Sequence, residues 1–210
     1  MATTLPRPAD TPEVEAPQPA IGSLRRWYAL MLVGGALGVV TAAWQTVERI
    51  VWEGDPNAGS ICEINAVLSC SSVFSHWQSS ALGIPNSLIA MPLFAMFAAA
   101  GLAGVLGSRL SKSFLATMAG FAAFFAVFIF WYLEQSAFSI GILCLFCLGC
   151  FVNLVIAGSG AIRVAAAERA FGEGRFGRQM TLQAEAGVDL IVWAGLVAVV
   201  ALMLVAGLAL

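Results

Sequence analysis

The chain has 210 residues, of which 60% are hydrophobic and only 10% are charged, and its mean hydropathy is +0.89. These values exclude an ordinary soluble globular domain and indicate an integral membrane protein. The net charge of −2 selects no class of partner. We therefore predict an all-α membrane protein.

Five stretches are long and apolar enough to cross a membrane, which takes about 20 helical residues. Residues 1–25 precede them, contain five prolines and no apolar run, and predict a disordered cytoplasmic tail without a cleaved signal peptide. The last stretch reaches the end of the chain, so we expect no soluble thiol domain behind it. The predicted spans are residues 27–47, 82–107, 113–133, 135–162 and 190–210. They define a transmembrane bundle at 26–162 with an outward loop at 48–82, a cytoplasmic loop at 163–187 and a fifth helix at 188–210.

The basic residues are concentrated on one predicted side of the membrane. Three arginines precede the first span, Arg109 and Lys112 separate the second and third, and four arginines lie in residues 163–187. The positive-inside rule makes these segments cytoplasmic. We therefore predict a multi-pass protein of the inner (plasma) membrane with a cytoplasmic N-terminus. Loop 48–82 then faces the periplasm or exterior, where disulfides are permitted.

Three local patterns describe the predicted outward side. Residues 71–80 carry three large apolar side chains among serines, which predicts a short amphipathic helix lying on the bilayer as a lid. Pro85 suits the first turn of the second span. We expect Glu134 to end the third span, followed by a short connection at 135–139, so that the third and fourth spans are antiparallel neighbours.

Four of the five cysteines form two pairs on the same predicted side. Cys62 and Cys70 lie in the polar loop, and Cys144 and Cys147 form a Cys-Leu-Phe-Cys sequence in the fourth span. Residues three apart on a helix share a face, so Cys144 and Cys147 are able to form a disulfide or to hold a dithiol. One pair within reach of a soluble protein and a second pair within the bilayer form the arrangement of an electron relay.

The start of the fourth helix affects the chemistry of Cys144. A helix that begins near Ile142 places backbone N–H groups and the helix dipole beside its sulfur, and a helix that begins near Ala137 does not. The sequence leaves both starts open.

Two other interpretations of the cysteines are also open. Cys144, Cys147 and Cys150 form a C-x2-C-x2-C run that is reminiscent of a metal or iron–sulfur site. On a straight helix, however, these positions drift around the axis, and without such a site Cys150 is a buried packing residue. A structural or transport subunit stapled by its loop cysteines ranks last, because the spans hold no deeply placed ionisable group.

Three segments carry a resemblance to a known family: CEINAVLSCSSVFS from Cys62, Gly83-Ile-Pro-Asn-Ser87, and Leu143-Cys-Leu-Phe-Cys147. They resemble the vitamin K epoxide reductase family, specifically its bacterial disulfide-forming homologues, over roughly residues 27–160. The resemblance implies a four-helix transmembrane bundle around a quinone pocket, with a fifth transmembrane helix outside it. It also implies a quinone-dependent thiol:disulfide oxidoreductase. Such an enzyme reoxidises a periplasmic thioredoxin-like protein and reduces ubiquinone or menaquinone, without a metal.

The resemblance also implies a role for each matching residue. Cys62 exchanges disulfides with the partner, Cys70 passes electrons inward by attacking Cys144, and Cys147 is the sulfur next to the quinone. Asn86 matches an asparagine that hydrogen-bonds a quinone oxygen. From its position alone, Asn86 is equally well interpreted as a helix cap.

Three further positions either are candidate site residues or differ from the residue that the family has there. Phe151 stands where animal members have a tyrosine, and its missing hydroxyl argues against epoxide reduction. The serine that stabilises the relay in the family falls near Ser75 or His76. His76, the lone histidine, is also a candidate proton donor near neutral pH, with a solvated interfacial residue as the alternative.

Overall fold

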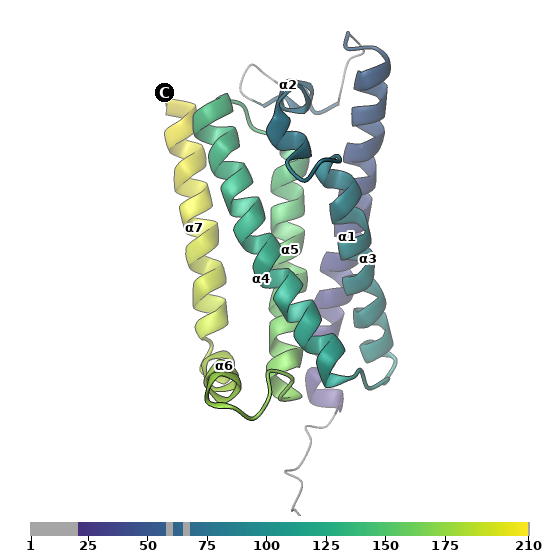
Figure 1. Cartoon of the computed structure of the whole chain (residues 1–210), viewed down its shortest axis with the longest axis vertical. Helices are drawn as coiled ribbons and strands as arrows, with labels where there is room; N and C mark the ends of the chain where they lie inside the picture. The colour runs from purple at the N-terminus through teal and green to yellow at the C-terminus, as the bar shows by residue number, and fades with distance from the viewer. Residues whose placement is uncertain (1–20, 58–60, 65–67, 210) are drawn as a thin grey trace, which may run out of the picture.

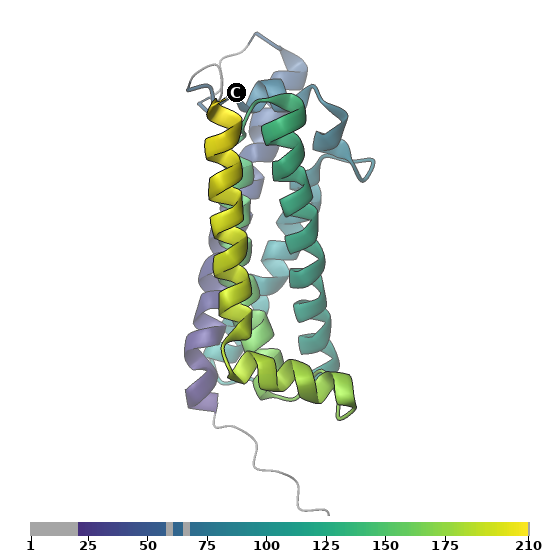
Figure 2. The same ribbon diagram turned by 90° about the vertical axis from the view of Figure 1, so that its left-hand side faces the viewer.

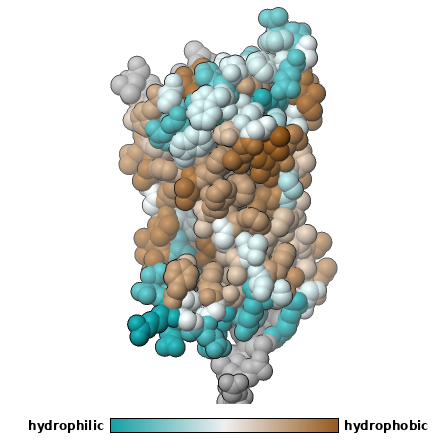
Figure 3. All heavy atoms as spheres, viewed as in Figure 1, coloured by the Kyte–Doolittle hydropathy of each residue, from teal (hydrophilic) through white to brown (hydrophobic). Residues whose placement is uncertain are grey.

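The computed structural model describes residues 21–57, 61–64 and 68–209. Five of its helices are long and apolar enough to cross a membrane, and the described residues contain no strand. Figure 3 shows an apolar band between two polar ends. The prediction of an all-α membrane protein with five spans is therefore confirmed. The long helices are α1 (Ile21–Gly54), α3 (Asn86–Val105), α4 (Lys112–Glu134), α5 (Leu145–Ala167) and α7 (Val188–Ala209).

Four of these helices pack into a bundle, and the last lies outside it. Helix α1 packs along α3 and α5, and α4 packs along α5, whereas α7 makes fewer contacts with α4 and α5 (Figure 1). Helix α6 (Arg175–Glu185) lies across one end of the bundle (Figure 2). Two short helices, α2 (Cys70–Phe74) and the 3-10 helix η1 (Trp77–Ser80), lie at the opposite end, which we call the cysteine end.

Helix α1 is longer than its sequence predicts. It begins at Ile21, inside the predicted tail at 1–25, and continues to Gly54, inside the predicted loop at 48–82. The rest of that tail lies outside the described residues. Side-chain contacts one turn apart stabilise the extra turns: Trp44 Nε1 donates to Glu48 Oε1 at 3.1 Å, and Arg49 pairs with Glu53 at 2.8 Å.

The predicted loop at 163–187 is mostly helical. Helix α5 continues through the alanine-rich segment to Ala167, and α6 begins at Arg175. Alanine and arginine are strong helix formers, which explains the extension. The break between the two helices includes Gly172, whose φ of 85° lies in the left-handed region that favours glycine.

The predicted lid is two short helices and not one. Helix α2 ends at Phe74, and His76 has an extended backbone (φ −93°, ψ 143°) before η1 begins. Val73 and Phe74 are buried, whereas Trp77 is exposed. Ser75 donates to Ser72 O and Ser79 donates to His76 O, and such side-chain bonds to the backbone compete with a continuous helix.

Candidate active site

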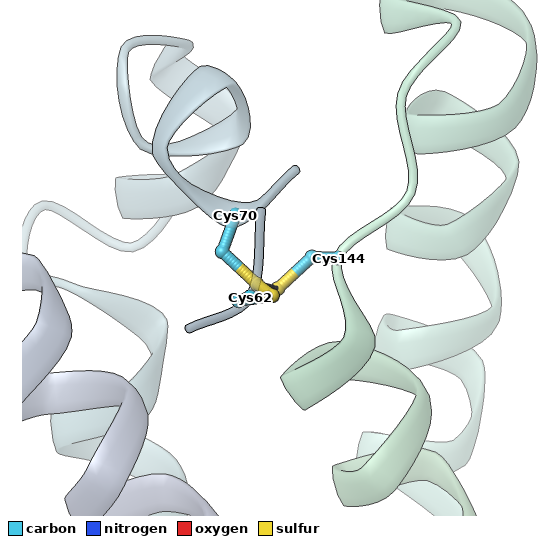
Figure 4. Close-up of side chains that lie close together, drawn as sticks. All are labelled: Cys62, Cys70 and Cys144. Carbon is cyan, nitrogen blue, oxygen red and sulfur yellow. Dashed lines mark hydrogen bonds between the residues drawn. A yellow bond between two sulfur atoms is a disulfide. The ribbon is translucent and has the colours of Figure 1, made fainter. Parts of the chain in front are cut away.

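Three cysteine sulfurs meet at the cysteine end of the bundle. Cys62 and Cys70 are joined by a disulfide, and Cys70 Sγ lies 3.2 Å from Cys144 Sγ (Figure 4). All three side chains are buried, and Cys62 is only 1% exposed. The loop pair and the first cysteine of the second pair are therefore in direct contact.

Main-chain hydrogen bonds hold this contact in register. Leu68 and Leu143 form an isolated parallel β-bridge, and Ser69 N donates to Leu143 O at 3.2 Å. The Ser69 hydroxyl then caps α2 by accepting from Ser72 N at 3.3 Å. Cys70, the first residue of α2, is thereby fixed opposite Cys144.

The connection between α4 and α5 corrects the predicted start of the fourth span. Residues Gln135–Ile140 continue α4 as a π-helix, an irregularity that is frequent at functional sites. Gly141 ends it with a φ of 72°, and Ile142 N donates to Ser136 O at 3.1 Å. The chain is then extended until α5 begins at Leu145, ten residues later than predicted.

Cys144 is thus the N-cap of α5 and precedes the membrane-spanning segment. Of the two helix starts that the sequence leaves open, the later one is nearer to the structure. Burial raises the pKa of the Cys144 thiol well above its ordinary range, and backbone N–H groups of Phe146 and Cys147 act in the opposite direction. The backbone N–H groups at the helix start therefore offset part, but not all, of the effect of burial on the pKa of Cys144.

A cavity of about 70 Å³ lies on the bundle side of the relay. It has room for roughly five water molecules. The lining is mainly apolar and includes Phe94, Phe125 and Leu154. Its sulfur and amide groups come from Cys147, Cys150, Asn86 and Gln45.

Gln45 and Tyr132 are site residues that the sequence reasoning missed. Gln45 Nε2 lies 3.5 Å from Cys147 Sγ and 3.9 Å from Cys144 Sγ. Tyr132 of α4 is buried in the same cluster of side chains as Cys147, and it also lines the cavity. One signal was available for Gln45: it is a lone amide in an otherwise apolar stretch, and polar groups inside spans are usually functional.

Asn86 stands at the first turn of α3 and faces both the lid and the cavity. Its Nδ2 donates to Gln78 O at 2.8 Å, and its Oδ1 is buried without a hydrogen-bond partner in the described part of the chain. A primary amide has two N–H bonds, so one N–H and one oxygen stay available to a molecule in the cavity. The N-cap position of α3 is Pro85, and Asn86 is the first residue inside the helix.

The other candidates, Phe151, Ser75 and His76, do not line the cavity. Phe151 is buried and packs with Cys147 and Tyr132, but it is not among the described residues that line the cavity. Ser75 and His76 are exposed, both bond to Ser72 O, and neither lines the cavity. The lid serine that does line it is Ser79, which accepts from Arg49 Nη1 at 2.7 Å.

The sulfur atoms of the C-x2-C-x2-C run do not form a compact group in the described part of the chain. Within the described residues, the sulfurs of Cys62, Cys70 and Cys144 lie within 4.8 Å of one another, whereas those of Cys144, Cys147 and Cys150 form no such group. Two of the three gathered sulfurs are bonded to each other and offer no thiolate. We therefore do not pursue the metal interpretation.

The bundle and its cysteine cluster define the class of multi-pass helical membrane proteins that carry a redox-active cysteine centre. A sequence model of the vitamin K epoxide reductase family matches residues 29–159, and the chain belongs to this family. Membership makes it a quinone-linked membrane oxidoreductase. The comparison with curated proteins found no match.

Proposed function

We propose that the protein is a membrane thiol oxidase. It takes two electrons from a reduced thioredoxin-like protein on the periplasmic side, passes them from Cys62/Cys70 to Cys144/Cys147, and delivers them to a membrane quinone. The observation that carries the proposal is the 3.2 Å contact between Cys70 Sγ and Cys144 Sγ. Thiol–disulfide exchange requires one sulfur to approach another in this way.

The first exchange oxidises the reduced partner and reduces the outer pair. A thiolate of the partner attacks Cys62, the Cys62–Cys70 bond breaks, and Cys70 leaves with the electron pair. The second partner thiol then resolves the mixed disulfide, so the partner is oxidised and Cys62/Cys70 is a dithiol. Because Cys62 is buried, its segment has to move before a folded partner can reach the sulfur.

The second exchange moves the electrons inward. The Cys70 thiolate attacks Cys144 of the oxidised inner pair, and Cys147 leaves as a thiolate. Cys62 then attacks Cys70, which restores the outer disulfide and releases Cys144 as a thiol. The outer pair is oxidised and the inner pair holds two electrons, the same pairing as in the structure.

The cavity fits a quinone ring as the electron acceptor. Its walls are mainly apolar, Cys147 lines it, and the unpaired Asn86 Oδ1 marks a polar group without a protein partner. A quinone that accepts two electrons and two protons becomes a hydroquinone. Because the inner pair gives up these electrons, the Cys144–Cys147 disulfide forms again. We assign to Asn86 the hydrogen bond to a quinone oxygen, and we assign no proton transfer to the exposed His76.

The test is reoxidation of a reduced thioredoxin-like protein by the purified enzyme. We expect turnover only when a quinone is added, and no quinone reduction by Cys147→Ala because the inner pair can no longer form a disulfide. Thr117→Ala is a matched control, since its hydroxyl only bonds to Ser113 O within α4. Quinone-independent turnover, or full activity of Cys147→Ala, contradicts the proposal.

A further inference from the structure

Gln45 places a primary amide at the buried cysteine pair. It is itself buried on α1, and its Nε2 lies within reach of both Cys147 Sγ (3.5 Å) and Cys144 Sγ (3.9 Å). A buried amide in an apolar span is unfavourable unless its hydrogens find acceptors. Here the acceptors are the two sulfurs that change their bonding during the relay.

Cys147 has a second polar neighbour on another helix. Tyr132 of α4 is buried in the same cluster as Cys147, and Tyr132, Gln45 and Cys147 line the same cavity. The hydrogen bond that the structure gives this sulfur comes from the Gln45 amide. Cys147 is only 6% exposed, so water contributes little to its solvation.

The inward exchange step creates a negative charge at this sulfur. When the Cys70 thiolate attacks Cys144, the Cys70–Cys144 bond forms and the Cys144–Cys147 bond breaks. The electron pair of the broken bond stays on Cys147 Sγ. A buried thiolate is destabilised by desolvation unless hydrogen bonds replace water, and exchange is faster when the departing thiolate is more stable.

We propose that Gln45 is a catalytic residue of this exchange, whose amide N–H groups hydrogen-bond the Cys147 thiolate as it forms. The inference rests on the proposed function, because it concerns the step between the two cysteine pairs. A catalytic role of Gln45 predicts that its loss slows the exchange between the cysteine pairs even without quinone. A residue that only shapes the cavity would not have this effect.

A structural polar contact on the same helix provides the control. One turn before Gln45, Thr41 Oγ1 accepts from Asn153 Nδ2 at 3.1 Å and donates to Leu37 O at 2.9 Å. This pair joins α1 to α5, and in the described residues neither side chain bonds to a sulfur. Thr41→Val removes a hydroxyl from the same helix interface at nearly constant shape.

The experiment is a single turnover of the full chain in detergent, with both pairs oxidised and quinone removed. Reduced thioredoxin is added, the reaction is quenched with acid, and the thiols of Cys144 and Cys147 are counted by alkylation and peptide mass spectrometry. We expect Gln45→Met, which keeps the side-chain length but has no N–H donor, to slow their appearance roughly 10- to 100-fold. Thr41→Val keeps the wild-type rate.

Gln45→Glu gives a second readout with a distinct pH signature. A protonated carboxyl still donates a hydrogen bond, whereas a carboxylate repels the forming thiolate. The ratio of the Gln45→Glu rate to the wild-type rate therefore falls as pH rises through the carboxyl's pKa. Taking the ratio removes the pH dependence that comes from titratable groups present in both proteins. The titratable or charged groups at this position are Arg49, Tyr132, Cys147, Cys150 and the adjoining Cys144.

The outcomes separate this inference from the proposed function. Exchange at the wild-type rate in Gln45→Met, or a raised KM for quinone with unchanged exchange, overturns the role of Gln45. If Gln45→Met does not fold, a pH-independent rate ratio in Gln45→Glu overturns it instead. A wild-type protein whose inner pair stays oxidised in the presence of reduced thioredoxin counts against the proposed function itself.

Discussion

Each of the four paired cysteines has a different set of neighbours. Cys62 is bonded to Cys70, and Cys70 also contacts Cys144. Cys147 lines the cavity beside Gln45. The sulfurs thus form a chain from the loop to the cavity, in which Cys70 and Cys144 provide the contact between the pairs. Electrons that enter at the loop pair therefore have a direct route to the sulfur at the cavity.

Asn86 yields a prediction about affinity for quinone. Asn86→Ala removes the free N–H and oxygen that face the cavity, together with the hydrogen bond to Gln78 O. We expect the KM for quinone to rise about tenfold, the effect of one lost hydrogen bond, with a smaller change in kcat. Steady-state kinetics with varied quinone measure this. Asn57→Ala is the control, because Asn57 is exposed near the same end of the bundle. An unchanged KM in Asn86→Ala would mean that the amide only ties α3 to the lid.

Sequence reasoning at this scale identifies residues by spacing and type, which suits the cysteines better than their surroundings. Cys62, Cys70, Cys144 and Cys147 stand out as two pairs, and their contact follows from placing both on one side of the membrane. Gln45 lies about a hundred positions away in the chain, and only the packing of α1 against α5 brings it to Cys147. The helix period alone does not specify which faces meet.

Helices α1 and α3 approach each other more closely than large side chains would permit. A Cβ atom built at Gly101 of α3 would collide with Leu32 N and, at 2.7 Å, with Tyr28 O, all backbone atoms of α1. Gly35 of α1 faces the backbone of Ala98 in the same way. Small residues at helix interfaces let membrane helices pack at this distance. Because α1 carries Gln45, this packing also contributes to the position of the site.

The close packing predicts a strong effect of one methyl group. Gly101→Ala forces the two backbones apart, and we expect a loss of roughly 1–3 kcal/mol in stability, as for other overpacked sites. Gly120→Ala in α4 is the matched control, because a Cβ atom there meets nothing within 4 Å. Alanine also favours a helix over glycine, so this control should be neutral or slightly stabilising. Thermal unfolding of both variants in one detergent measures the difference, and equal midpoints would rule out the close contact.

Helices were predictable from the sequence where the composition changes sharply from polar to apolar. Their ends were not predictable where local backbone geometry determines them. Apolar runs locate the five spans, but α1 continues past the charged residues Glu48 and Arg49 to Gly54, and no charge or proline marks the start of α5 at Leu145. The π-helix is invisible to patterns that assume a regular period. The late start of α5 matters most, because it leaves Cys144 on an extended segment that pairs with the loop.

The whole molecule has chemically different ends. Glu48, Glu53 and Asp55 are acidic groups at the cysteine end, whereas Arg109, Lys112 and the arginines of α6 lie at the opposite end. The polar ends and the apolar band between them are visible in Figure 3. The positive-inside rule then favours the cysteine end facing outward, which the proposed exchange with a periplasmic partner requires.

This orientation is testable with an impermeant thiol reagent on intact bacterial cells. All five native cysteines are buried, at most 6% exposed, so the wild-type chain gives a low background. We expect Asp55→Cys, at the cysteine end, to be labelled before the cells are opened, because Asp55 is exposed on the predicted outer side. Glu173→Cys, equally exposed at the opposite end, should be labelled only after permeabilisation. The reverse pattern would place the loop pair in the cytoplasm, where reduced thiols predominate, and would remove the basis for a periplasmic partner.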